Sequence, residues 1–283
     1  MPKVIIVGCG FLGEAAADLF LKDGWSVLGL CGHEESARRL EGKGLAISVI
    51  DITQEYVAPA AWRGADALVF CASTRGGDPS AYRSVYLDGL LNSIAAFKPR
   101  RVLFCSSTSV YAQTDGSIID EESEANPPRD AGLTLRDAEG VTLACGGYVA
   151  RLAGLYGPGR SVLLKKFLAD EAVIEGEGRR WINQIHRDDA ASAIIRLFTH
   201  RAAPGVYNVA DDTPTSQREI YEWLSEFHHK PLPPSTDTPQ PTRRGWSNKR
   251  VSNAKLRAIG WAPVYPSFRE ALQHLPPAGD AKQ

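Results

Sequence analysis

The chain has 283 residues, of which 43% are hydrophobic and 23% charged, so it can build a packed core and is not of the disordered class. Its 32 Lys and Arg residues nearly balance 33 Asp and Glu residues, whereas domains that coat nucleic acid carry a basic excess. No apolar run approaches the ~18 residues of a membrane span. We therefore expect a globular chain of roughly two domains that binds neither nucleic acid nor a membrane.

The cysteines and histidines are too scattered to indicate a disulfide framework or a metal site. Successive cysteines are 22 to 40 residues apart with no C-x-x-C pair, and none of the six histidines has a Cys or carboxylate at metal-ligand spacing. The odd number of cysteines, five, fits a reducing compartment. The sequence thus predicts a cytoplasmic protein without a bound metal.

The first half of the chain alternates short β-branched runs with helical patterns, which is typical of βαβ units and a parallel sheet. Several runs lack in-out alternation, as expected of strands that are covered on both faces. We expect strands at Lys3–Val7, Trp25–Leu30, Ala46–Ile50, Ala67–Phe70, Arg101–Cys105 and Tyr148–Leu152, and helices near Phe11–Lys22, Glu34–Lys43, Ser80–Phe97 and, as a short one, Thr134–Leu143.

Beyond Leu152 the pattern is less regular. Loop signals occur at Tyr156–Arg160 and Glu175–Arg179, and the Pro-rich stretch Lys230–Pro241 is expected to be extended. Helices are expected at Asp188–Thr199, Ser216–Phe227, Ser252–Ile259 and Ser267–Leu275, a strand that returns to the sheet at Val206–Val209, and a flexible tail at 276–283.

A glycine-rich turn follows the first strand. Gly8, Gly10 and Gly13 have GxGxxG spacing, in which the first glycine makes a tight turn, the second lets the backbone approach a pyrophosphate and the third allows close helix packing. The next helix begins with Phe11 and Leu12, and its N-terminus offers free N–H groups and a positive dipole end to that anion. Because a helix and a second strand follow, we favour dinucleotide binding over a turn that only packs the sheet.

The end of the second strand bears on which dinucleotide binds. NAD-specific sites usually place Asp or Glu there to bind the ribose 2′-OH, but this chain has Cys31 and then His33. With no carboxylate to repel a 2′-phosphate, and with Arg38 and Arg39 downstream, NADP is favoured over NAD as the cofactor. The alternative is that the two arginines form an ordinary solvated helix face.

The segment Arg101–Tyr111 (RVLFCSSTSVY) resembles the extended short-chain dehydrogenase/reductase family, which comprises nucleotide-sugar epimerases and dehydratases. Further matches follow the family's order along most of the chain. They are Asp51-Ile52, Cys71-Ala72-Ser73, RLAGLYGPGR at 151–160, IHRDD at 185–189, YNVA at 207–210, and KRVSNAK at 249–255 with Gly260-Trp261.

The resemblance implies an α/β fold, a Rossmann-type doubly wound parallel sheet with a smaller C-terminal α+β substrate lobe. We expect the NAD(P)-binding domain at 1–155 plus 186–210 and the substrate lobe at 156–185 plus 211–275. Ligands of such sheets bind outside the carboxyl ends of the strands.

The resemblance also assigns roles to residues at those strand ends. Asp51 and Ile52 would contact the adenine, and the groove that holds the cofactor would be lined by the run Cys71-Ala72-Ser73. Ser107 stands at the family's catalytic Ser/Thr position. The alternative for Ser106–Ser109 is a polar strand exit that only satisfies backbone groups.

The sequence departs from the family pattern in its first turn and in the catalytic pair. The usual turn is GxxGxxG, and Val7 stands where the earlier glycine would be. The family's general acid/base is a Tyr followed four residues later by a Lys, which lowers the phenol pKa. Yet no tyrosine lies between Tyr111 and Tyr148, and no lysine between Lys98 and Lys165.

An alignment anchored on Glu139 puts Ala131 and Leu135 at the positions of that pair. Only 16 residues separate Leu135 from Arg151, so we expect the helix that carries the pair to be shortened. The chain therefore looks like an atypical member, either an NAD(P)-dependent oxidoreductase or epimerase-like enzyme with an unconventional proton donor, or a non-catalytic NAD(P)-binding sensor or scaffold. In the family this helix also forms a dimer bundle, so a monomer and a homodimer both remain open.

Tyr111 is the remaining candidate for a proton donor, and packing is its alternative role. Without a neighbouring lysine its pKa is expected near the reference of ~10, which makes it a poor base.

An anionic substrate is suggested by a run of positive charge near the C-terminus. The stretch from Thr238 to Arg269 contains no Asp or Glu. With Arg151, Arg160 and Arg187 near the sheet's carboxyl edge, it would suit an anion such as a nucleotide sugar. The alternative is a solvated face that balances the acidic segment Asp115–Glu124. The seven cations of the stretch are Arg243, Arg244, Lys249, Arg250, Lys255, Arg257 and Arg269.

Overall fold

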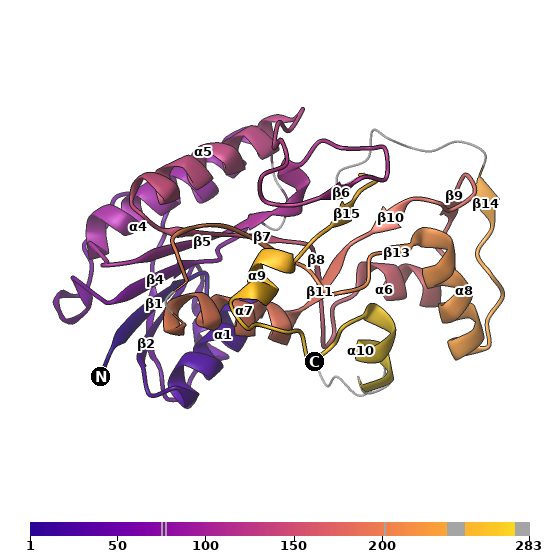
Figure 1. Ribbon diagram of the computed structural model, residues 1–283. Coiled ribbons are helices and arrows are strands. Elements are labelled where there is room, and N and C mark those ends of the chain that lie inside the picture. The colour runs from indigo at the N-terminus through magenta and orange to yellow at the C-terminus, as the bar shows by residue number, and fades with distance from the viewer. Residues whose placement is uncertain (75, 77, 201, 237–246, 275–283) are drawn as a thin grey trace.

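The computed structural model describes residues 1–74, 76, 78–200, 202–236 and 247–274. Its centre is a seven-stranded sheet with helices on both faces (Figure 1). All neighbouring strands of this sheet are parallel, which confirms the expected Rossmann-type α/β fold. Across the sheet the order is β12 (Gly205–Val209), β7 (Tyr148–Leu152), β5 (Val102–Ser107), β4 (Ala67–Phe70), β1 (Lys3–Val7), β2 (Ser26–Cys31) and β3 (Ala46–Val49).

The strand order creates a switch point between β1 and β4. From β1 the chain moves to one side through β2 and β3, then returns to β4 and moves to the other side through β5, β7 and β12. Helices that leave neighbouring strands in opposite directions leave a crevice at the carboxyl ends, which is where ligands of open α/β sheets bind. The predicted edge strand at Val206–Val209 does return to the sheet, beside β7.

The two faces of the sheet are covered by different helices (Figure 1). On one face lie α1 (Phe11–Lys22) and α7 (Arg187–Thr199), which pack against each other. On the other lie α3 (Pro79–Arg83), η2 (Ser84–Asp88), α4 (Gly89–Phe97) and α5 (Asp130–Ala144). The residues of β1 from Val4 to Val7 are fully buried, because helices cover this strand on both sides.

The helix after β2 is shorter than predicted. Helix α2 (Glu34–Arg38) ends before Lys43, and Gly42 and Gly44 both have positive φ. Two glycines in the left-handed region form turns instead of continuing the helix. The predicted helix Ser80–Phe97 is nearly continuous but contains the π-helical turn η2 at its middle.

The helix before β7 is longer than the predicted span Thr134–Leu143. Helix α5 has 15 residues and starts at Asp130, four residues before the expected start. The short spacing to β7 comes instead from the tight turn after the helix, where Gly146 has a φ of +65°. Gly147 next to it has no room for a side chain, since a Cβ would lie 2.6 Å from the Val102 carbonyl oxygen.

A second, smaller group of elements is formed mostly by the chain after β7, together with β6, which lies between β5 and β7 in the sequence. Its described residues form four two-stranded sheets and a hydrophobic cluster of their own, built around Tyr156, Phe167, Tyr221 and Phe268. The helices are α6 (Val162–Leu168), α8 (Gln217–His228), α9 (Ala254–Ala258) and α10 (Phe268–His274), and the strand pairs are β8 (Gly154–Tyr156) with β11 (Gln184–His186), β9 (Ile174–Glu175) with β14 (Ser235–Thr236), β10 (Trp181–Ile182) with β13 (Thr215–Ser216), and β6 (Ile118–Ile119) with β15 (Arg250–Val251).

Some sequence expectations fall outside the described residues, namely the tail at 276–283, residues 237–241 of the Pro-rich stretch, and Arg243 and Arg244. Within the described ranges, no helix is both long and apolar enough to cross a bilayer. The same residues contain no group of three or more His, Cys, Asp or Glu side chains that could hold a metal ion.

Candidate functional site

The turn between β1 and α1 requires glycine at two positions and leaves open space at the third. Gly8 has a φ of +85°, and a Cβ there would lie 2.4 Å from the Ala72 Cα. A Cβ on Gly13 would lie 2.5 Å from the Gly8 carbonyl oxygen. At Gly10, by contrast, no heavy atom lies within 4 Å of the Cβ position. The backbone at Gly10 can therefore be approached closely by a ligand.

Two arginines from the second half of the chain converge on the start of α1. The guanidinium carbons of Arg160 and Arg187 lie 5.0 and 5.2 Å from the ring centre of Phe11, the first residue of the helix. Arg160 closes a tight turn in which Gly157 and Arg160 exchange backbone hydrogen bonds of 2.9 and 3.0 Å. Arg187 is paired with Asp188 at 2.8 Å, so it is the positive charge of Arg160 that adds to that of the helix N-terminus, where anions bind favourably.

The carboxyl end of β4 is in direct contact with the turn. The Cys71 thiol donates a hydrogen bond of 3.3 Å to the Gly8 carbonyl oxygen, and burial raises the pKa of this thiol. The next residue, Ala72, packs on Gly8, and Ser73 is exposed. The structure thus brings Cys71, Ala72 and Gly8 together at the switch point of the sheet.

Residues at the ends of β2 and β3 are mostly exposed. His33 and Arg38 both lie on the surface at α2. The Asp51 carboxylate is also exposed and accepts hydrogen bonds from the Thr53 hydroxyl and backbone N–H, which lower its pKa. The Ile52 carbonyl oxygen accepts a 3.0 Å hydrogen bond from Asn92, so this strand exit is held against α4.

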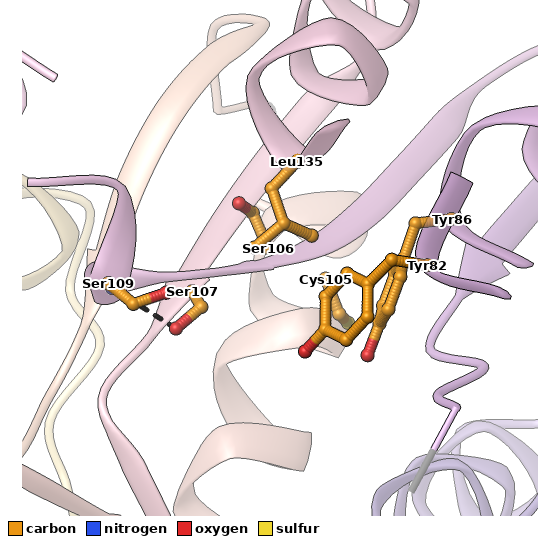
Figure 2. A pocket seen from close by; sticks show the side chains of 7 residues that line it. All are labelled: Tyr82, Tyr86, Cys105, Ser106, Ser107, Ser109 and Leu135. Carbon is orange, nitrogen blue, oxygen red and sulfur yellow. Dashed lines mark hydrogen bonds between the residues drawn. The ribbon is translucent and has the colours of Figure 1, made fainter. Parts of the chain in front are cut away.

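A cavity of about 290 Å³ lies at the carboxyl end of β5. Figure 2 shows its walls, which come from β5, the 3-10 turn after it, α5 and the segment of α3 and η2. The Ser107 hydroxyl accepts a 3.1 Å hydrogen bond from the Ser109 backbone N–H. The residues that line the cavity are Tyr82, Tyr86, Cys105, Ser106, Ser107, Ser109 and Leu135.

A buried ionic cluster lies beside this cavity and shares Ser106 and helix α5 with it. Glu139 of α5 is fully buried and accepts hydrogen bonds of 3.0 and 2.7 Å from Arg151 and one of 2.6 Å from the Ser106 hydroxyl. Arg136 also pairs with this carboxylate. The cluster ties α5 to β5 and β7, and so holds the wall of the cavity that contains Leu135.

Arg151 and Tyr111, both suggested from the sequence as site residues, lie in the core. Arg151 is 2% exposed, and its guanidinium carbon lies 4.7 Å from the ring centre of Tyr111. The Tyr111 hydroxyl donates a 2.9 Å hydrogen bond to Asn208, and burial raises its pKa above the reference value that the sequence suggested. Neither side chain is among those that line the cavity with Ser107.

The described cations of the C-terminal basic stretch do not share one surface. Lys249 is 1% exposed and donates to the Tyr111 carbonyl oxygen, and Arg257 pairs with Asp212. Arg250 donates to the Gly116 carbonyl oxygen and lies 5.2 Å from the ring centre of Trp181. Because β15 pairs with β6, this stretch lies beside the acidic segment Asp115–Glu124, but the buried Lys249 is not part of the solvated face considered from the sequence.

Sequence reasoning missed the two tyrosines of the cavity. Tyr82 and Tyr86 are four residues apart within the predicted helix Ser80–Phe97, a spacing that places two side chains on one helix face. Their ring centres lie 4.8 Å apart. The i, i+4 pair was the available signal, but nothing in the sequence indicated that this helix face would meet the end of β5.

Comparison with known proteins bears on the family to which this chain belongs. A family model described as "NAD dependent epimerase/dehydratase family" matches residues 4–210. Protein YeeZ of Escherichia coli K12 is 29% identical over 237 residues, covering 80% of this chain and 84% of that protein. The dTDP-6-deoxy-L-talose 4-dehydrogenase (NAD(P)(+)) of Kitasatospora kifunensis is 26% identical, covering 96% and 93%.

A solved structure shows the same likeness. A functionally unknown conserved protein from Silicibacter pomeroyi superposes with a TM-score of 0.78 at 26% identity, covering 97% of this chain and 98% of that one. The family match covers the whole central sheet, from β1 to the edge strand β12. The fold, the glycine turn at the switch point and these likenesses agree, and the chain belongs to the NAD-dependent epimerase/dehydratase family.

Proposed function

We propose that this protein is an NAD(P)-binding, epimerase/dehydratase-like oxidoreductase that acts on an anionic substrate such as a nucleotide sugar. It would use a proton donor other than the usual Tyr and Lys pair. One observation carries the proposal: the Gly8–Gly13 turn, open at Gly10, contacts the carboxyl end of β4, and Ser107 lines a cavity at the end of the next strand. A dinucleotide on the turn and a small substrate in the cavity would then be neighbours.

The residues at the turn suit a dinucleotide. Only at Gly10 is there space for a diphosphate against the backbone, since Gly8 and Gly13 are packed on protein atoms. We assign the diphosphate to Gly10, Phe11 and Leu12 at the start of α1, and the adenosine half to Asp51 and Ile52. When bound, the nicotinamide would accept or donate the hydride.

NADP is proposed as the preferred cofactor over NAD. The supporting observation is that His33 and Arg38, which follow β2, are exposed and available to a 2′-phosphate. No Asp or Glu stands at the end of β2 to bind a 2′-OH or repel a phosphate.

For the substrate we propose an anion held by Arg160, Arg187 and Arg250, in a lobe formed by 156–185 and 211–275. The separate hydrophobic cluster of these segments supports the division of the chain into two units. Arg151 is not retained as a substrate ligand, because Glu139 neutralises it in the core. A homodimer and a monomer are equally compatible with this assignment.

A non-catalytic NAD(P)-binding sensor or scaffold is the second candidate. The observation in its favour is Leu135, which the family resemblance aligns with the catalytic lysine and which lines the cavity as an apolar side chain. Such a protein would bind the cofactor and turn over no substrate.

Calorimetric titration with NAD, NADH, NADP and NADPH tests the cofactor assignment. Gly10→Asp should fold normally, because its Cβ enters open space, and should lose binding, because its carboxylate meets the diphosphate. Gly140→Asp is the matched control, since Gly140 on α5 also has open space at its Cβ position. No binding of any of the four dinucleotides to the wild type at millimolar concentration would refute the proposal.

The substrate class is tested on the cofactor-loaded protein. UDP-, dTDP- and GDP-linked hexoses are added in a thermal-shift assay at low and high salt, because a charged ligand should stabilise the protein in a salt-sensitive way. Arg250→Ala should reduce the stabilisation by the best sugar and leave cofactor affinity unchanged. A complete absence of salt-sensitive stabilisation would remove the anionic substrate, and binding without turnover would favour the sensor.

A further inference from the structure

We propose that Tyr86 is the proton donor of this site. The assignment rests on the proposed function and names the residue that takes the place of the family's catalytic tyrosine. Its ring lines the same cavity as Ser107, at the carboxyl end of β5. In Figure 2 the rings of Tyr86 and Tyr82 lie side by side on the side of the strand to which Ser107 points, with both hydroxyl groups directed the same way.

The position of Tyr86 is set by contacts with two neighbouring strands. Its ring meets that of Phe104 on β5 edge to face, with centres 6.5 Å apart and an interplanar angle of 89°. Its hydroxyl is hydrogen-bonded to Thr74, three residues beyond Cys71 at the carboxyl end of β4. The phenol oxygen therefore lies between the ends of β4 and β5, next to the crevice at the switch point.

The local helix geometry also sets Tyr86 apart. It lies in η2, a π-helical turn inserted between α3 and α4. Single π-helical turns are rare and occur frequently at functional sites, because the added residue changes the direction of the side chains in that turn. Tyr82, four residues earlier in α3, packs on its ring and fixes its orientation.

The protonation state suits an acid. Burial raises the pKa of Tyr86 to about 12, and the neighbouring Tyr82 adds to the rise, so the phenol carries its proton at neutral pH. The hydroxyl of Tyr111, the donor considered from the sequence, instead donates its hydrogen bond to Asn208 in the core. Of the phenols that the structure describes, only Tyr82 and Tyr86 line the cavity.

The step proposed is the reduction of a carbonyl group. The carbonyl carbon of the substrate receives a hydride from the reduced nicotinamide, which is oxidised, and the carbonyl oxygen receives the Oη proton of Tyr86. The C=O bond becomes a CH–OH group, and a phenolate remains on Tyr86. Hydrogen bonds from the Thr74 backbone and side chain, which lower the phenol pKa, stabilise that phenolate until water returns the proton.

A spectroscopic experiment tests the placement of Tyr86 without any substrate. The nine tyrosines are labelled with ¹³C at Cζ, and the signals of Tyr86 and Tyr207 are assigned by their loss in Tyr86→Phe and Tyr207→Phe. Tyr207 is the matched control, because its side chain is buried, its hydroxyl donates to the Ala203 carbonyl oxygen, and it is not among the residues that line the cavity. Saturation with the cofactor that binds in calorimetry should shift the Tyr86 signal and leave the Tyr207 signal in place.

A kinetic experiment tests the role. With NADPH or NADH and dTDP-4-keto-6-deoxyglucose as the carbonyl probe, Tyr86→Phe should lower kcat about 10²–10⁴-fold with little change in KM, as expected for loss of a general acid. Tyr207→Phe should retain wild-type kcat, and Tyr82→Phe should lose less than Tyr86→Phe.

Three results separate the possible failures. If cofactor binds but the Tyr86 signal does not move, or if Tyr86→Phe retains wild-type kcat, the assignment of Tyr86 is wrong and the proposed function stands. If Tyr82→Phe shows the larger loss, the donor is Tyr82 and the assignment is again wrong. If no dinucleotide binds to the wild type, the proposed function fails first.

Discussion

Replacement of Glu139 by glutamine should destabilise the protein by a large, measurable amount. The side chain is fully buried and accepts hydrogen bonds from both Arg151 and Ser106, while Arg151 itself is 2% exposed. Glu139→Gln leaves the Arg151 charge buried without a counter-ion. Removal of one partner of a buried ion pair costs about 3–5 kcal/mol. That is a large part of the ~5–15 kcal/mol that stabilises a typical protein.

The free energy of unfolding is measured by urea denaturation of the wild type, Glu139→Gln, Arg151→Met and the double variant Glu139→Gln/Arg151→Met. A loss of this size lowers Tm by on the order of 10 °C in a chain of this length. The double variant should be more stable than the sum of single losses predicts, because no charge is left unpaired. A loss below about 1 kcal/mol in Glu139→Gln would refute the argument that Arg151 depends on this carboxylate.

Three other predictions follow from the same structure. Tyr111→Phe should lower the free energy of unfolding in urea by about 1 kcal/mol, because its hydrogen bond to Asn208 is lost, and should leave cofactor affinity at the wild-type value. A loss of cofactor binding would instead show that Tyr111 belongs to the cofactor site. Burial lowers the pKa of Lys249 from 10.5 to about 8, so between these pH values the folded state binds fewer protons than the unfolded state. The free energy of unfolding should therefore rise with pH from about 8 to 10.5. Lys249→Met should remove this part of the rise, and identical pH profiles of the two proteins would contradict the prediction. Arg160→Ala should reduce the salt-sensitive stabilisation of the cofactor-loaded protein by the best nucleotide sugar, since Arg160 is proposed to hold the substrate anion. Arg179→Ala, which removes an 82% exposed arginine paired with Glu177, should have no effect, and equal stabilisation of the two variants would remove Arg160 from the substrate site.

The local pattern of the sequence determined the sheet and the glycine turn. Runs such as Val4–Val7 are apolar at every position, which only a strand covered on both faces satisfies, and β1, β4 and β7 have the predicted bounds. The positive φ of Gly8 and the contact of a Gly13 Cβ with the Gly8 carbonyl oxygen arise within one strand, turn and helix, so the glycine spacing could be read locally, whereas the contact of Gly8 with Ala72 required the fold.

Only the tertiary structure decided which side chains meet at the strand ends. The residues of β7 from Tyr148 to Arg151 are all buried, and burial of the charged Arg151 depends on Glu139, which comes from α5 and neutralises it. Tyr86 reaches the end of β5 because a π-helical turn interrupts its helix and because β4 and β5 are neighbours in the sheet. Contacts between segments distant in sequence depend on the packing of helices on the sheet, which no local pattern of residues encodes.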